Sequence, residues 1–409
     1  MKGSAHKANL AVYVLLLGAV VPYAYIDTWR ISGLPGVNYI ACIAAFACAA
    51  LMGRKSLGSL LLLVAFALYA YMAIEGALSR AEERWTLKLY LTDLLYSGMF
   101  LAGLVFGIES QPKDQVRVMA QSFVISTVGL IGITGALAVG FLPSVGSAGR
   151  VFDPSQYILH YWQLSTATYF IEFYKERRYL RMAIGIPALL IAFIFPLYSV
   201  TRSSFLFASS LVACLLLTQA KGSGKAVVLG LFLIALLLFT LGDGVEFIKG
   251  LGLLGERFSS ESLTADMRYT ETLALLEQLG GNYLGGRGFG YAFYTPVVIK
   301  GEGFEELGVT PHIGLISFLY KGGILVWLPF MAALIIAITL SILRSGADRY
   351  SAIVLGPLCL YAIVGSMSGG YGIYYMFMLG VVLATVLSHS RQPEFKRRRH
   401  ILSWRQKDR

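Results

Sequence analysis

The stretch KAVVLGLFLIALLLFTLG, residues 225–242, decides the fold class of this chain. Its length suits the hydrocarbon core of a membrane, which takes about 20 mainly apolar residues to cross. Similar runs recur from one end of the sequence to the other. Of the 409 residues, 56% are hydrophobic and 14% are charged, and the mean hydropathy is +0.67. Because soluble domains carry about 25% charged residues, the composition indicates an integral membrane protein.

Outward from this stretch, the sequence predicts an all-α fold, a polytopic membrane helical bundle of about 12 transmembrane helices. The tenth span is long, and we expect it to contain a short helix, broken at Gly322-Gly323, before the true span. Asp93 lies inside the fourth span, where a charge is costly, and should pair with a polar neighbour. The expected spans are 8–26, 37–52, 57–75, 88–108, 117–142, 156–174, 181–199, 203–219, 225–242, 313–343, 351–367 and 371–389.

Basic residues occupy every second connection between these spans. They include the run KERRYLR (175–181) and the tail EFKRRRHILSWRQKDR. Because positively charged connections stay in the cytoplasm, we expect an even number of spans and both termini on the cytoplasmic side. The chain then divides into spans 1–9 (1–242), one large extracytoplasmic segment between spans 9 and 10 (243–312), spans 10–12 (313–389) and a basic cytoplasmic tail (390–409).

The long hydrophilic connection, residues 243–311, has ten acidic against five basic side chains, which makes its net charge −5. It is therefore no generic basic surface for anions, and we expect no nucleic-acid partner. A connection of this length is often functional. Within it, TADMRYTETLALLEQL (264–279) predicts a short helix that ends at Gly280-Gly281.

The turn NYLGGRGFGYAF (282–293) combines a permanent cation, Arg287, with three glycines at alternate positions. Gly286, Gly288 and Gly290 would allow positive φ, chain flexibility and the close approach of a ligand. Their spacing does not fit a nucleotide-binding loop. Three further arginines are expected at the same membrane face, namely Arg150, Arg202 and Arg268.

Arginines that converge from separate connections indicate a diphosphate ligand outside the cytoplasm, because their planar fork matches phosphate oxygens. The alternative for each single arginine is a solvated or snorkelling side chain. His312 directly precedes an apolar helix, IGLISFLYK. A helix N-terminus disfavours imidazolium, so a neutral His312 could act as a general base; the alternative is a histidine hydrogen-bonded into the bundle. No group of residues has metal-ligand spacing, so we predict neither a catalytic metal nor a cofactor.

These motifs, in this order, resemble the bacterial O-antigen polymerase and O-antigen ligase superfamily. The resemblance covers about residues 145–345 and rests on TRSS, an arginine opening a helix, GRGFG, and a histidine before a helix with GGI. It implies an undecaprenyl diphosphate-linked glycan as donor, at the periplasmic face of the bacterial inner membrane. It also implies that Arg202, Arg268 and Arg287, with Arg150, hold the diphosphate, and that His312 activates the acceptor hydroxyl.

The favoured reading is an inverting, metal-independent glycosyltransferase that polymerises O-antigen or exopolysaccharide repeat units, with a chain-length regulator as a possible partner. The first alternative is a ligase that transfers the glycan to lipid A-core, although Ile313 stands where ligases commonly have Asn, Ser or Gln. The second is a flippase or transporter, which would favour internal repeats and ions near the bilayer midplane. Four aromatic residues could stack on sugars or pack the segment onto the membrane, namely Tyr269, Tyr291, Phe293 and Tyr294.

Overall fold

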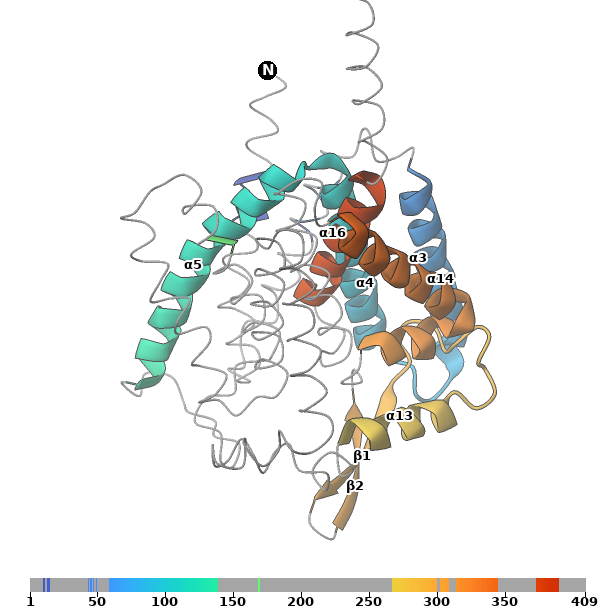
Figure 1. Cartoon of the computed structure of the whole chain (residues 1–409). Helices are drawn as coiled ribbons and strands as arrows, with labels where there is room; N and C mark the ends of the chain where they lie inside the picture. The colour runs from blue at the N-terminus through green and yellow to red at the C-terminus, as the bar shows by residue number, and fades with distance from the viewer. Residues whose placement is uncertain are drawn as a thin grey trace, which may run out of the picture.

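The structure is a computed structural model that describes residues 10–11, 13–14, 43, 45, 47, 49, 59–138, 168–169, 267–299, 302–308, 314–344 and 373–389. This part of the chain consists mainly of long helices, with one small β-hairpin (Figure 1). Within it, the helices that are long and apolar enough to cross a membrane are Leu60–Ala81, Leu87–Glu109 and Ile316–Ala337. The prediction of a helical membrane protein is therefore confirmed for these residues. The predicted spans 181–199, 203–219, 225–242 and 351–367 lie wholly outside them.

The first long described segment contains three helices that match the third, fourth and fifth predicted spans. They are α3 (Leu60–Leu78), followed by the short 3-10 helix η2 (Ser79–Ala81), α4 (Leu87–Glu109) and α5 (Pro112–Ala138). Thr86 caps α4, since its hydroxyl accepts a hydrogen bond from the Leu89 N–H at 3.3 Å. α5 begins with Pro112, whose fixed φ suits the first position of a helix. Helix starts here follow from local sequence.

The C-terminal half contributes α13 (Met267–Gln278), the strands β1 (Phe293–Ile299) and β2 (Glu302–Gly308), and the helices α14 (Gly314–Arg344) and α16 (Ile373–His389). The short helix expected at 264–279 is confirmed by α13. The strands pair antiparallel, with Phe293 opposite Gly308. This hairpin is an addition to the expected all-α fold. α13 and the hairpin lie at one end of α3, α4 and α14 (Figure 1).

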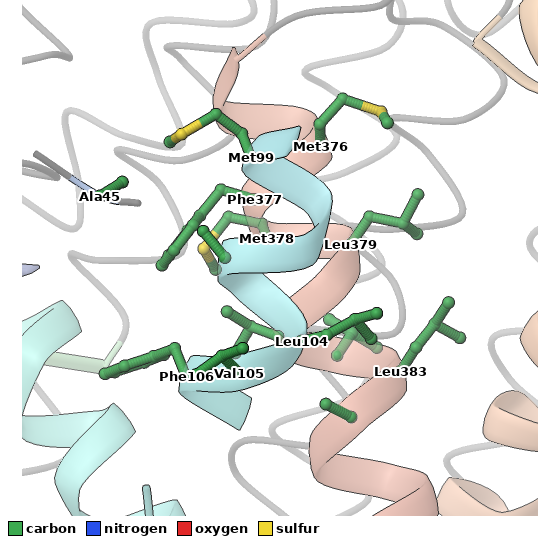
Figure 2. Close-up of a cluster of buried hydrophobic side chains, with 14 of the residues drawn as sticks. Ala45, Met99, Leu104, Val105, Phe106, Met376, Phe377, Met378, Leu379 and Leu383 are labelled. Atoms are coloured by element: carbon green, nitrogen blue, oxygen red, sulfur yellow. The ribbon is translucent and has the colours of Figure 1, made fainter. Parts of the chain in front are cut away.

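The tightest helix pair is formed by α4 and α16, which lie side by side (Figure 2). Both helices carry small residues four positions apart at the contact, Gly103 and Gly107 on α4 and Gly380 and Ala384 on α16. A Cβ atom at Gly107 would come within 2.7 Å of the Ala384 side chain. Small residues at this spacing let two helix backbones approach closely, which drives helix association in lipid. Around them, buried side chains such as Leu104 fill the interface.

A buried polar group also joins the start of α5 to α16. The side-chain amide of Gln115 donates to the Thr385 hydroxyl at 2.7 Å and to the Ser110 hydroxyl at 3.0 Å. All three residues are at most 1% exposed. Hydrogen bonds between helices contribute to association where no water competes. The pair α4–α16, with α5 attached, therefore forms a rigid base for the neighbouring helices.

We predict that Gly103→Ala lowers the thermal unfolding temperature of the purified protein in detergent. The new methyl group would meet the backbone carbonyl of Phe377, which a side-chain rotation cannot relieve. Overpacking of this kind costs about 1–3 kcal/mol. Leu91→Ala is the matched control, since Leu91 lies on the same helix and is 48% exposed. Equal unfolding temperatures for the two variants would contradict the predicted role of the small residues.

Candidate functional site

The break predicted in the tenth span lies inside α14. Gly323 has φ 61° and ψ −165°, which interrupts the helix after Lys321-Gly322. A helix break exposes carbonyl and amide groups that a continuous helix would pair internally. Within a membrane such groups need partners from the protein or from a water-filled cavity. The break predicted at Gly322-Gly323 is confirmed, and its backbone groups must find those partners elsewhere in the chain.

The glycine turn, which we define as residues 282–290, supplies these partners. It lies against the break and pairs with both of its sides. Four backbone hydrogen bonds join them: Arg287 N–H to Tyr320 O (2.8 Å), Gly288 N–H to Lys321 O (2.8 Å), Ile324 N–H to Tyr283 O (2.8 Å) and Leu325 N–H to Leu284 O (3.2 Å). The turn therefore satisfies carbonyl groups before the break and amide groups after it.

The opposite side of the glycine turn is bonded to the end of α3 and to the connection between η2 and α4. Backbone and side-chain groups both take part. The bonds of the turn are Phe289 N–H to Met72 O (3.1 Å), Thr86 N–H to Gly290 O (2.9 Å), Tyr71 O–H to Gly285 O (3.1 Å) and Trp85 Nε1–H to Phe289 O (3.1 Å). Just after the turn, Ala292 N–H donates to Arg84 O (2.9 Å). The turn is thus enclosed between α3, the start of α4 and the break of α14.

Three glycines of this turn have the positive φ predicted for them, 75° at Gly286, 76° at Gly288 and 86° at Gly290. The close approach that they permit is to the chain itself. A Cβ atom at Gly286 would lie 2.7 Å from backbone atoms of the α14 break, and one at Gly288 would lie 2.6 Å from the Cα of Gly76. Their lack of a side chain is what allows the turn to be packed on both sides, and the flexibility expected of them stays a prediction.

A buried ion pair completes this arrangement. The Lys321 ammonium lies 2.5 Å from Oδ2 of Asp93, and each side chain is only 3% exposed. The same Oδ2 accepts a hydrogen bond from the Gly290 N–H at 2.8 Å. The prediction that Asp93 pairs with a polar neighbour is confirmed. One carboxylate therefore links α4, α14 and the glycine turn.

Arg287 lies at the edge of this packed region, with its side chain 19% exposed. Its Nε and Nη2 groups both donate to the carbonyl of Gln278, the last residue of α13, at 3.2 and 3.0 Å. A cation at this place suits the negative end of the helix dipole. Nη1 is 3.9 Å from a carboxylate oxygen of Glu82, a partner that is itself 46% exposed. Arg287 therefore has a structural role in addition to any contact with a ligand.

Tyr291 lies beside this arginine, whose guanidinium carbon is 5.1 Å from the centre of the ring. Such a cation–π contact adds a modest attraction at a partly exposed site. Burial raises the pKa of the Tyr291 hydroxyl above its ordinary value, while the positive charge of Arg287 acts in the opposite direction. The hydroxyl therefore stays protonated at neutral pH. Arg287, Glu82 and Tyr291 together form the polar rim of the packed region.

The other residues predicted for the site are described to different extents. Arg268 lies in the first turn of α13, at the helix whose C-terminal carbonyl Arg287 binds. Arg150, Arg202 and His312 lie outside the described residues, so their convergence with Arg287 stays a prediction. α14 begins at Gly314, two residues after His312, the predicted base.

Of the four aromatic residues singled out, Tyr291 and Phe293 are buried within the protein itself. They are 7% and 1% exposed, and their ring centres lie 6.2 and 5.8 Å from that of Tyr320. Both rings are thus buried against α14. Tyr269 and Tyr294 remain candidates for sugar contacts.

Some residues of this region were missed by sequence reasoning. Lys321 is the most important. The sequence could have identified it, since it is a lone cation between an apolar helix and Gly-Gly. Trp85 and Met72 contribute contacts that no local sequence pattern predicts, because these contacts depend on which segments pack together. Comparison with protein-family models, with curated proteins and with solved structures finds no match for this chain.

We predict that Gly288→Ala destabilises the glycine turn far more than Gly281→Ala. Both glycines have positive φ, 76° and 90°, so each substitution carries a backbone strain of roughly 1–2 kcal/mol. Only at Gly288 does the methyl group also collide with the backbone of Gly76, since nothing lies within 4 Å of a Cβ at Gly281. Thermal unfolding in detergent measures the difference. Equal decreases in the unfolding temperature of the two variants would contradict close packing of the turn against Gly76.

Proposed function

We propose that this protein is a membrane glycosyltransferase that uses undecaprenyl diphosphate-linked glycan as donor. It polymerises O-antigen or exopolysaccharide repeat units at the periplasmic face of the inner membrane. The observation that carries the proposal is the fixed position of Arg287, at the end of the helices, between the C-terminal end of α13 and the break of α14. The order of sequence motifs from Arg202 to His312 supports it further.

The geometry of Arg287 suits a preorganised anion contact. One edge of the guanidinium, Nε and Nη2, is held by the Gln278 carbonyl. Nη1, on the other edge, lies 3.9 Å from the exposed carboxylate of Glu82, which is too far for a hydrogen bond. A phosphate oxygen would compete with this carboxylate and form the stronger, charge-assisted bond. A cation that is already held in place stabilises charge as it develops, without the cost of rearrangement.

In the proposed reaction, an acceptor sugar hydroxyl attacks the anomeric carbon of the lipid-linked donor. The new C–O bond forms while the bond between this carbon and the diphosphate oxygen breaks, and the electron pair leaves with the lipid diphosphate. The hydroxyl proton passes to the neutral imidazole of His312. Arg202, Arg268 and Arg287, with Arg150, stabilise the charge that builds on the leaving group. Direct displacement inverts the configuration at the anomeric carbon.

The break in α14 also bears on the transport alternative. Transporters use the ends of broken helices to bind substrates or ions near the bilayer midplane. Here Tyr320 O, Lys321 O, Ile324 N–H and Leu325 N–H already pair with the glycine turn. The break is thus used for internal packing, which favours a transferase over a transporter.

We predict that His312→Ala and Arg287→Ala abolish glycan transfer without preventing membrane insertion. Loss of a general base costs about 10²–10⁴-fold in rate. Loss of one preorganised charge contact costs about 10²–10³-fold. The assay measures transfer by the purified full-length protein with a lipid diphosphate-linked repeat unit. Arg80→Ala is the matched control, because Arg80 is exposed on η2 and should be merely solvated. Wild-type turnover of His312→Ala would remove this residue from the mechanism.

The glycolipids of a deletion strain separate the remaining alternatives. Single repeat units attached to core would indicate a lost polymerase, as proposed. Bare core with accumulated lipid-linked polymer would instead indicate a lost ligase. An unchanged profile, with no transfer by the purified protein, would refute the glycosyltransferase proposal.

A further inference from the structure

The Asp93–Lys321 pair is the point where three separate segments meet. Asp93 comes from α4, Lys321 from the break of α14, and Gly290 from the glycine turn. Oδ2 of Asp93 binds both the Lys321 ammonium, at 2.5 Å, and the Gly290 N–H, at 2.8 Å. Lys321 also binds the turn through its backbone, because its carbonyl accepts from the Gly288 N–H at 2.8 Å. Both members of the ion pair therefore bind the glycine turn directly.

A buried ion pair is a poor source of stability, since desolvation of the two charges offsets their attraction. Its better-supported role is to select one arrangement over others. Here the selected arrangement includes the turn, because Oδ2 of Asp93 has its backbone donor only when Gly290 lies beside it. The pair thus disfavours arrangements in which the turn has left the break of α14.

Arg287 depends directly on this arrangement. Its own N–H donates to Tyr320 O, one residue before Lys321, and Gly290 is only three positions further along. The direction of its guanidinium is then set by the Gln278 carbonyl. Any movement of the turn out of the break must move the backbone of Arg287 as well.

We propose that Asp93 and Lys321 are positioning residues for Arg287: their ion pair holds the glycine turn in the break of α14 and so fixes the guanidinium at the site. The effect on transfer rests on the proposed function. The effect on the turn does not, and it can be measured whether or not the protein transfers glycan.

Two double variants with matched shapes test the effect on the turn. Asp93→Asn/Lys321→Met removes both charges but keeps a side-chain oxygen that can accept from Gly290. Asp93→Leu/Lys321→Met removes the charges and the acceptor together. Hydrogen exchange of the full-length protein in detergent is followed at residues 282–293, with α4 and α16 as internal references.

We expect the amides of the turn to exchange faster in the Asn/Met variant than in wild type, because the ion pair is lost, and about tenfold faster again or more in the Leu/Met variant, because a buried donor also loses its acceptor. Exchange in α16 should not differ between them. Exchange of the turn at the wild-type rate in the Asn/Met variant, or equal exchange in the two variants, would overturn the proposal. If the Leu/Met variant does not fold, Asp93→Asn alone is compared with wild type. It removes the negative charge of the ion pair, so the turn should again exchange faster, and unchanged exchange would overturn the proposal. Lys88→Met is the control, since Lys88 is an exposed lysine on α4.

Steady-state transfer kinetics then separate the two proposals. Because Arg287 is proposed to contact the donor diphosphate, the Leu/Met variant should lose kcat/KM for the donor by about 10-fold or more while KM for the acceptor stays unchanged. A loosened turn with unaltered donor kinetics would refute positioning of Arg287 and leave the glycosyltransferase intact. Absence of transfer in the wild-type protein would refute the proposed function, whereas the exchange result would still stand.

Discussion

The Asp93 carboxylate is the group on which the rest of this region depends. It is buried inside a membrane helix, where an unpaired charge would be expensive, and it is satisfied only by groups from two other segments. Lys321 provides the opposite charge, and Gly290 provides a backbone donor. Since both partners come from residues more than 190 positions away in the chain, the pair can form only when α4, α14 and the glycine turn are all in place.

The segment between the ninth and tenth predicted spans is therefore partly packed among the helices. Residues 282–290 run between α3, the start of α4 and the break of α14, and their backbone groups bond to all three. The helix break and the turn need each other. Without the turn, the carbonyl and amide groups at Gly322-Gly323 would be unsatisfied in an apolar environment. Without the break, the turn would have no partners on that side.

This arrangement holds the cation of the turn, Arg287, in a fixed position. An arginine in a mobile loop would have to be ordered whenever a ligand binds, at an entropic cost. Arg287 is instead held by its own backbone N–H, by the α13 carbonyl and by the ring of Tyr291. Such a fixed charge fits a site in which negative charge develops on a leaving group. It also means that a single substitution at Arg287 affects both structure and chemistry, so the turn and the transfer reaction have to be followed separately.

The sequence by itself determined those features that depend on local composition and spacing. Apolar runs of sufficient length identified α3, α4 and α14 as candidate membrane helices, α13 followed from its glycine stop, and the Gly-Gly break was visible as two helix-breaking residues. Asp93 was recognisable as a charge in need of a partner. The tertiary structure alone decided that this partner is Lys321, that the glycines let the turn pack closely against other segments, and that a hairpin follows the turn. These outcomes depend on which distant segments share a boundary, and contacts between residues far apart in the chain leave no periodic signal in either segment.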